Sequence, residues 1–316
     1  GRADRGFLEY VTDRSRVAFP WTMIDKITPR PDASVKKMLE DAGFTDTESI
    51  VTSKNTYVAP FVNAEEAQYL VIENAFPNGR PALENAGVMF TSRETVEKVE
   101  RMKVCTCLNP LHTALAVYGC LLGYTKISDE MKDADLVKLV EIIGYKEGLP
   151  VVTDPGILSP KKFIDEVLQI RVPNPFMPDT PQRIACDTSQ KLSIRFGETI
   201  KEYMASSELD VKSLKFIPMV QAGWCRYLLG VDDELNAFTV SPDPMYEELA
   251  GKLAGVKVGE SCDVHAVLSP ILSDAKIFGV NLYEAGLGEY VESIFAELIA
   301  GKGAVRETLK RHLAEA

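Results

Sequence analysis

Three polar residues, Lys103, Asn109 and His112, interrupt the apolar stretch of residues 103–124, KVCTCLNPLHTALAVYGCLLGY. A lysine, an amide and an imidazole are side chains that polarise a carbonyl group and transfer a proton. A buried polar group without a hydrogen-bond partner costs about 1–3 kcal/mol, so Asn109 and His112 need partners in this apolar segment. A bound substrate could be that partner.

The spacing of these residues predicts an irregular helix. Asn109 and His112 are three residues apart and share one helix face. In a regular helix the nine residues from Lys103 to His112 would place these two side chains about 180° apart. Pro110 has no N–H for the carbonyl of Thr106, so we expect a kink or a π-type insertion just before it. Absorbing one residue reduces the angle to about 80°, and the three groups can then converge.

Each of the three residues has a chemical and a structural interpretation. Lys103 would be the general acid–base, taking the proton of a hydroxyl in oxidation and returning it in reduction. Asn109 would donate its amide N–H to the developing alkoxide, a contact worth a few kcal/mol. His112 would hold an adjacent hydroxyl group. The structural alternatives are an ordinary surface lysine and a satisfied core histidine.

A second set of cations follows later in the chain. Residues 181–206 predict a helix in which Arg183 and Lys191, eight residues apart, lie roughly on one face. In the structural interpretation they form surface ion pairs with Asp187 or Glu198, worth about 0–1 kcal/mol.

The motif formed by Lys103, Asn109 and His112 resembles the Lys-x(4)-Asn-x(2)-His signature of the polyol-specific long-chain dehydrogenases. That family includes mannitol dehydrogenase, fructuronate reductase and tagaturonate reductase. This chain has five residues where the signature has four. Three further segments are similar to family segments: FPWTMIDKITPRP (19–31), AFPNGRPALENAGVMF (75–90) and RVPNPFMPDTPQRIACDTSQKLSIR (171–195).

The resemblance implies hydride transfer between NAD or NADP and a sugar-derived substrate. It places Asp25 as an acceptor of hydrogen bonds from substrate hydroxyls, and Arg183 and Lys191 as substrate ligands. Arg195, one turn after Lys191, could extend this cationic cluster. Because a guanidinium group suits a carboxylate, we expect a sugar acid, D-fructuronate/D-mannonate, with mannitol/fructose or tagaturonate as alternatives.

Composition excludes several other classes of function. The 316 residues are 46% hydrophobic and carry a formal net charge of −11, which argues against binding to nucleic acid or to a membrane surface. Six cysteines and three histidines have no zinc-site spacing, so we expect no metal and reduced core thiols in a cytoplasmic protein.

No dinucleotide fingerprint is visible in this sequence. There is no G-x-G-x-x-G after a predicted strand and no P-loop, and AGLGEY (285–290) lies in a helical pattern. The chain also begins without methionine in a helical pattern. We therefore expect a C-terminal part whose N-terminal dinucleotide-binding domain is a separate portion of a longer polypeptide. The alternative from another class is a helical binding or dimerisation module without catalysis.

The elements that must position these residues are predicted to be mainly helices. Apolar residues recur at spacings of three and four over residues 127–150 and 159–172. Thr91 or Ser92 is a suitable N-cap for the central helix. From residue 209 to the end we expect four or more further helices.

The N-terminal third is predicted to differ from the rest. Residues 1–18 are expected to form a short helix and linker, and residues 19–316 the helical substrate domain. Within the latter, β-branched and aromatic runs predict a small sheet near residues 49–92. Three prolines predict a fixed loop over residues 19–32, and four more predict an extended loop over residues 172–181.

Overall fold

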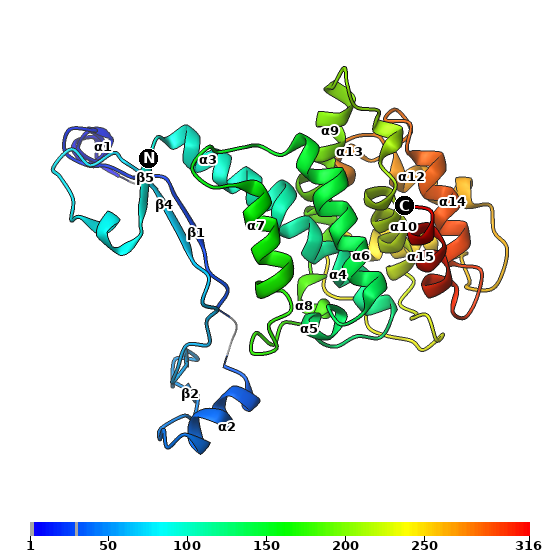
Figure 1. The fold of residues 1–316 in the computed structure, drawn as a ribbon, viewed down its shortest axis with the longest axis horizontal. Helices are drawn as coiled ribbons and strands as arrows, with labels where there is room; N and C mark the ends of the chain where they lie inside the picture. The colour runs from blue at the N-terminus through cyan, green and yellow to red at the C-terminus, as the bar shows by residue number, and fades with distance from the viewer. Residues whose placement is uncertain (1–2, 29–30) are drawn as a thin grey trace.

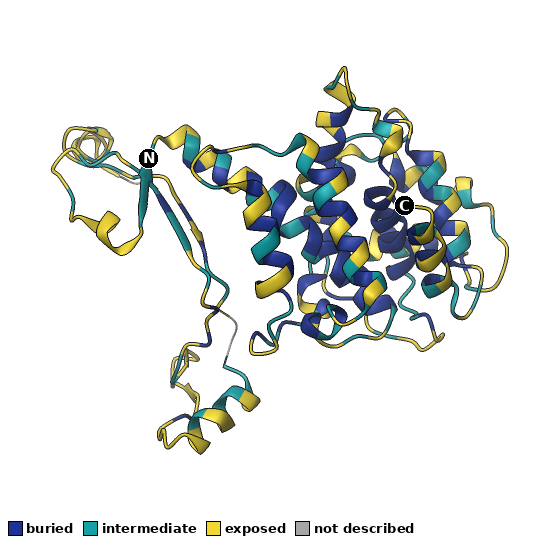
Figure 2. Cartoon of the chain, in the orientation of Figure 1, coloured by how far each residue is buried: buried dark blue, intermediate teal, exposed yellow. Residues whose placement is uncertain are grey.

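The computed structural model describes residues 3–28 and 31–316. Figure 1 shows a helical body with an N-terminal arm extending from one side. The body starts at α3 (Arg93–Met102), and everything before it belongs to the arm. Figure 2 shows that most buried residues lie in the body, whereas the arm is mainly exposed or half-buried. The predicted mainly helical fold with a small sheet is confirmed.

The arm holds a three-stranded sheet whose order is β1, β4, β5. Strand β4 (Tyr69–Glu73) pairs antiparallel with β1 (Thr22–Asp25) and parallel with β5 (Met89–Thr91). The other elements of the arm are α1 (Arg5–Thr12), α2 (Ala33–Asp41), the hairpin of β2 (Ile50–Val51) and β3 (Tyr57–Val58), and the 3-10 turn η1 (Leu83–Ala86).

The prediction of a loop over residues 19–32 is wrong for Thr22–Asp25, which form β1. Pro20 precedes the strand instead of interrupting it, and the later Pro29 lies outside the described residues. Within the strand Met23 and Asp25 are buried while their neighbours are exposed, the alternation of a half-buried strand. Four residues proved long enough to pair with β4.

In the body, one long helical run passes through the core. It consists of α3, the π turn η2 (Lys103–Cys107) and α4 (Asn109–Leu121). Ser92 caps α3 as predicted, its Oγ accepting a hydrogen bond from the Thr95 N–H at 3.2 Å. By length and composition this run could cross a membrane, but 83% of its apolar window is buried inside the protein. Its apolar side chains are thus used to pack the body.

The remaining helices surround α4 and the buried α10 (Phe216–Tyr227), as Figure 1 shows. They confirm the predicted helices over 127–150, 159–172 and the last hundred residues. Their bounds are α5 (Ile127–Glu130), α6 (Ala134–Glu141), η3 (Ile142–Gly148), η4 (Leu149–Val151), α7 (Pro160–Glu166), η5 (Val167–Arg171), η8 (Val211–Ser213), α11 (Tyr246–Leu253), α12 (Val264–Leu272), α13 (Ala275–Phe278), α14 (Gly288–Leu298) and α15 (Ala304–Ala314).

The single helix predicted over residues 181–206 is wrong. The chain forms α8 (Pro181–Ile184), the 3-10 turn η6 (Thr188–Gln190), the π turn η7 (Ser193–Gly197) and α9 (Glu198–Ala205). Asp187 adopts a left-handed conformation with φ of 52°, and its N–H donates to the carbonyl of Pro242 at 2.8 Å. Long-range hydrogen bonding therefore replaces helical bonding at this point, and Arg183 and Lys191 do not share a helix face.

Candidate functional site

A polar pocket of about 240 Å³ lies where the arm meets the body. Five of the seven predicted site residues line it: Asp25, Lys103, Asn109, His112 and Arg183. The other lining residues are Ile24, Lys26, Ile27, Val104, Leu108 and Asp179. The pocket thus combines the end of β1, the helical run through the core and the loop before α8.

The π turn η2 brings Lys103 to the same pocket as His112. The Leu108 N–H donates to the carbonyl of Lys103, five residues earlier, at 3.1 Å, and Pro110 stands in the first turn of α4. The insertion predicted before Pro110 is therefore present. It absorbs the additional residue between Lys103 and Asn109 that distinguishes this chain from the four-residue spacing.

Lys103 is held by an ion pair with Asp25. Its Nζ donates to Asp25 Oδ1 at 2.6 Å, and the side chains are 19% and 2% exposed. Arg171 donates to both Asp25 oxygens, at 2.7 and 3.1 Å. Burial raises the pKa of Asp25, but the hydrogen bonds and charges of Arg171 and Lys103 outweigh it and hold the pKa below its ordinary value. Asp25 is therefore an ionised partner of Lys103.

Asn109 and His112 offer hydrogen-bonding groups to the pocket. In residues 3–28 and 31–316 neither side chain has a protein hydrogen-bond partner. Burial lowers the pKa of His112 to about 4; the nearby carboxylate of Asp179 opposes this effect, and the charge of Arg195 adds to it. A neutral imidazole has one donor and one acceptor nitrogen, so His112 can orient a hydroxyl group.

The three predicted cationic ligands have different surroundings. Arg183 lines the pocket and forms a two-bond ion pair with Asp179, with Nε 2.6 Å from Oδ1. Lys191 donates to the carbonyls of Ile184, at 3.3 Å, and Cys186. Lys191 is not among the pocket-lining residues, but the charges of Arg195 and Arg183 help to lower its pKa.

Arg195 lies behind the pocket wall, against α4. Its Nη1 donates to Thr113 Oγ1 at 2.6 Å, and that hydroxyl donates to the carbonyl of Asn109 at 2.9 Å. Burial lowers the pKa of Arg195 to about 10. Neither Arg195 nor Lys191 forms an ion pair with any carboxylate in the described part of the chain. The two are therefore cations whose charge the protein does not balance directly.

Sequence reasoning missed three charged residues around the site: Glu65, Arg171 and Asp179. Glu65 accepts two hydrogen bonds from Arg171, at 2.7 and 2.9 Å. The signal for Arg171 and Asp179 was their place in the segment of residues 171–195 that is similar to a family segment. Glu65 gave no signal, because its partner lies 106 residues away.

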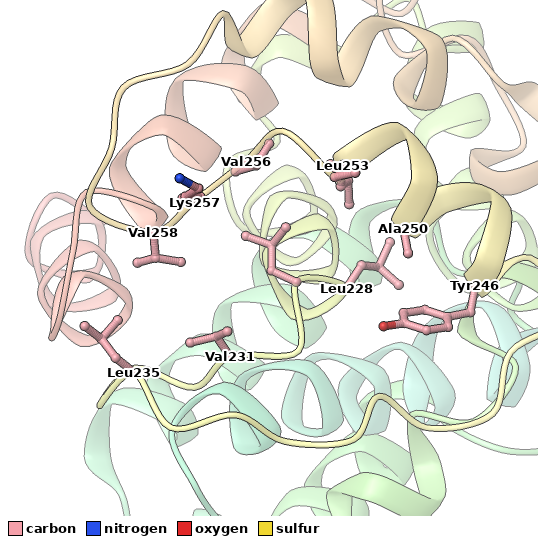
Figure 3. A pocket seen from close by; sticks show the side chains of 11 residues that line it. Leu228, Val231, Leu235, Tyr246, Ala250, Leu253, Val256, Lys257 and Val258 are labelled. Carbon is pink, nitrogen blue, oxygen red and sulfur yellow. The ribbon is translucent and has the colours of Figure 1, made fainter.

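A larger cavity of about 450 Å³ lies elsewhere in the body, between α11 and the segment after α10. Figure 3 shows its mainly apolar lining, which includes Leu228, Leu253 and Val256. Lys257 is the one charged residue in that lining, and it pairs with Glu260 at 3.5 Å on the surface. This cavity offers no acid–base pair, so the polar pocket is the better candidate for a catalytic site.

The comparisons with known proteins identify the family of this chain. The sequence model of the mannitol dehydrogenase C-terminal domain matches residues 95–294. A D-mannonate oxidoreductase of Thermotoga maritima is 58% identical over 98% of this chain and 57% of that protein. A mannitol 2-dehydrogenase of Aspergillus niger is 31% identical over 85% of this chain and 52% of that protein.

Among solved structures, the Pseudomonas fluorescens mannitol 2-dehydrogenase in a ternary complex with NAD and D-mannitol superposes with a TM-score of 0.74. It is 25% identical, and the match covers 99% of this chain and 57% of that chain. The chain thus spans little more than half the length of these relatives. This chain belongs to the mannitol dehydrogenase family and carries its C-terminal domain.

Proposed function

We propose that this chain is the substrate-binding and proton-transferring part of an NAD-dependent oxidoreductase that interconverts D-fructuronate and D-mannonate. The observation that carries the proposal is the convergence of Lys103, Asn109 and His112 in one pocket, where two of the three have no protein partner in the described chain. The 58% identity to a D-mannonate oxidoreductase favours the sugar acid over mannitol, because the mannitol 2-dehydrogenase relative is 31% identical.

The geometry supports a proton transfer through Lys103. In reduction its ammonium group would donate a proton to the oxygen of the substrate carbonyl, and in oxidation the amine would take the proton of the hydroxyl. The amide N–H of Asn109 would stabilise the negative charge that develops on that oxygen, a contact worth a few kcal/mol. The neutral His112 would orient a neighbouring hydroxyl, as its depressed pKa supports.

The charges around the pocket support a substrate that carries a carboxylate. Asp25 balances the charge of Lys103, and Asp179 balances that of Arg183. Arg195 has no such partner in the described chain. Its guanidinium group is linked to the backbone carbonyl of Asn109 through the hydroxyl of Thr113. Although Arg195 does not line the pocket, its positive charge would favour a substrate that carries a carboxylate over a neutral polyol.

The polar pocket is small, which supports a dinucleotide site outside it. Its volume of about 240 Å³ is below the range of about 300–1,000 Å³ usual for cofactor pockets, although it suits one sugar-sized molecule. We therefore propose that NAD, which would exchange the hydride, is bound mainly by an N-terminal dinucleotide-binding domain outside this chain. The polypeptide that contains both parts would be the active enzyme.

The test is NADH oxidation by the complete polypeptide with D-fructuronate, D-tagaturonate and D-fructose in parallel. We expect D-fructuronate to be preferred and Lys103→Ala to lower kcat by about 10²- to 10⁴-fold. Lys98→Ala is the matched control, because Lys98 lies on the same helical run but is half-buried, is paired with Glu94 and does not line the pocket. Arg195→Gln should lower kcat/KM for the sugar acids more than for fructose.

Other outcomes have definite meanings. A preference for fructose would leave the family assignment unchanged and would replace D-fructuronate/D-mannonate by fructose/mannitol as the proposed substrates. Unchanged turnover in Lys103→Ala would show that another group is the acid–base.

A further inference from the structure

Lys103 is the last member of a chain of four charged groups. Glu65 binds Arg171, Arg171 binds Asp25, and Asp25 binds Lys103. The contacts between Arg171 and the two carboxylates are four hydrogen bonds of 2.7 to 3.1 Å. Two carboxylates and two cations balance one another, as groups removed from water require.

Only one end of this chain of charges reaches the pocket. Asp25 and Lys103 line the pocket, whereas Arg171, whose side chain is 1% exposed, and Glu65 are not among its lining residues. Arg171 therefore has no direct contact with the reacting atoms; it binds Asp25, and its charge also contributes to lowering the pKa of the pocket residue His112. The ring of Phe163 lies 5.6 Å from its guanidinium carbon and closes the other side.

The same contacts join the arm to the body. Asp25 and Glu65 belong to the arm, while Arg171 ends the π turn η5 of the body and Lys103 begins the π turn η2. Glu65 also accepts the Ile27 N–H at 2.6 Å, so it holds the end of β1 beside Arg171. A planar guanidinium between two carboxylates fixes both the distance and the angle at which β1 presents Asp25 to Lys103.

We propose that Arg171, oriented by Glu65, is a positioning residue for proton transfer: it fixes the Asp25 carboxylate so that the ammonium group of Lys103 is held toward the substrate. This inference rests on the proposed function for the role of Lys103. Arg171 itself touches neither substrate nor cofactor.

The electrostatics of Asp25 give this role a measurable signature. The charged and titratable groups around Asp25 are Arg171 and Lys103 by direct contact, Glu65 on the same guanidinium group, and Tyr69 opposite Asp25 on β4. Burial raises the pKa of Tyr69 to about 12, and its hydroxyl donates to Glu166, so it stays neutral. Without Arg171, Lys103 alone opposes the effect of burial, so the pKa of Asp25 must rise. Protonation of Asp25 would remove the counter-ion of Lys103.

The variant that tests the proposal is Arg171→Lys in the complete polypeptide, with Arg171→Met as the more severe change. Lysine keeps one positive charge but cannot bind both carboxylates in fixed geometry. We expect Arg171→Lys to lower kcat about 10- to 100-fold with little change in KM, and to move the acid limb of the kcat–pH profile upward by about one pH unit. Arg171→Met should lower kcat further and move the acid limb further upward.

Arg226→Lys is the matched control. Arg226 is also a fully buried arginine, but it binds the backbone carbonyls of Val231, Asp232 and Leu298, and it does not line the pocket. This substitution should lower stability without moving the pH profile. An unchanged kcat and pH profile in Arg171→Lys, or the same shift in Arg226→Lys, would overturn the proposal.

A second measurement is independent of turnover. NMR titration of the Asp25 side-chain carboxyl carbon in the 316-residue chain should show a higher midpoint in Arg171→Lys than in the parent. If Lys103→Ala retains turnover while this midpoint moves, the role of Lys103 in the proposed function fails and the effect of Arg171 on Asp25 stands. If the midpoint does not move, the positioning role is wrong even for an active enzyme.

Discussion

At the scale of single residues, the site separates a charged pair from a neutral pair. Lys103 and Asp25 form an ion pair fixed by Arg171, whereas Asn109 and His112 are uncharged groups with free hydrogen-bonding capacity toward the pocket. In the proposed function the first pair would move a proton, and the second would hold oxygen atoms of a polyhydroxylated substrate. Two different tasks thus fall to two differently built parts of one pocket.

The depressed pKa of His112 predicts a pH-dependent stability. The unfolded chain binds a proton at His112 below its ordinary pKa of 6.5, whereas the folded chain does so only near pH 4. Between these values the unfolded state binds more protons, so stability is lost as the pH falls from about 6.5 to 4. The loss attributable to His112 is up to about 3 kcal/mol. Urea denaturation at several pH values should show a smaller loss for His112→Gln; equal losses in both proteins would contradict the assignment.

At the scale of elements, π turns position several charged residues at or near the site. Four are present in the described chain, and three of them carry charged residues discussed above: η2 carries Lys103, η5 carries Arg171 and η7 carries Arg195. A π turn adds one residue to a helical turn and so rotates the side chains that follow. These insertions let three helical segments direct cations toward the same region from different directions.

The turn η7 depends on Gly197, and this dependence can be tested. A Cβ on Gly197 would lie 2.2 Å from the carbonyl oxygen of Phe278 at the end of α13. Because that contact is with backbone, Gly197→Ala should destabilise the protein by about 1–3 kcal/mol and displace the turn that carries Arg195. The free energy of unfolding from chemical denaturation measures the effect.

Gly251→Ala provides the control for that substitution. Gly251 lies within α11 and has open space where a Cβ would be, so alanine should stabilise the helix by about 0.5–1 kcal/mol. Similar losses in both variants would show that the close approach of η7 and α13 is not the cause.

An element could be predicted from the sequence where the interactions that form it are between residues close together in the sequence. The missing N–H of Pro110 and the helical angle between Lys103 and His112 predicted η2. Both are properties of residues that are close together in the sequence. No proline marks η5 or η7, and Asp187 leaves the helical conformation because its N–H reaches Pro242. The ion pair of Arg171 with Asp25 spans 146 residues. Charge and spacing within one segment cannot reveal such a pair, so half of the charged network was missed.

At the scale of the whole molecule, the arm is built differently from the body. Neither α1 nor α2 has a buried residue, and large apolar side chains such as Phe7, Phe19 and Val62 are between 58% and 77% exposed. Figure 2 shows the contrast between this arm and the buried interior of the body. Large apolar side chains gathered on one exposed part of a protein indicate a surface that another protein part covers. The proposed dinucleotide-binding domain is such a part.

The proposal of a separate dinucleotide-binding domain predicts that the 316-residue chain needs that domain for turnover. We expect the chain alone not to oxidise NADH with D-fructuronate, and turnover to appear when the separately produced N-terminal part is added. Measured NADH absorbance follows the reaction, with Lys103→Ala in the added chain as the control for background oxidation. Turnover by the chain alone would contradict the placement of the cofactor site outside it.

Asp25 of the arm binds Lys103 and Arg171 of the body, and this contact limits where the domain can be truncated or exchanged between relatives. The family match begins at residue 95, after both carboxylates that hold Arg171. It ends at residue 294, before Arg306 of α15, which binds Asp133 and Asp135. A shorter polypeptide limited to the matched residues 95–294 would therefore leave Lys103 and Arg171 without these counter-ions. Grafts between relatives should carry residues 22–73 together with the helical body, so that both halves of the ion network come from one parent.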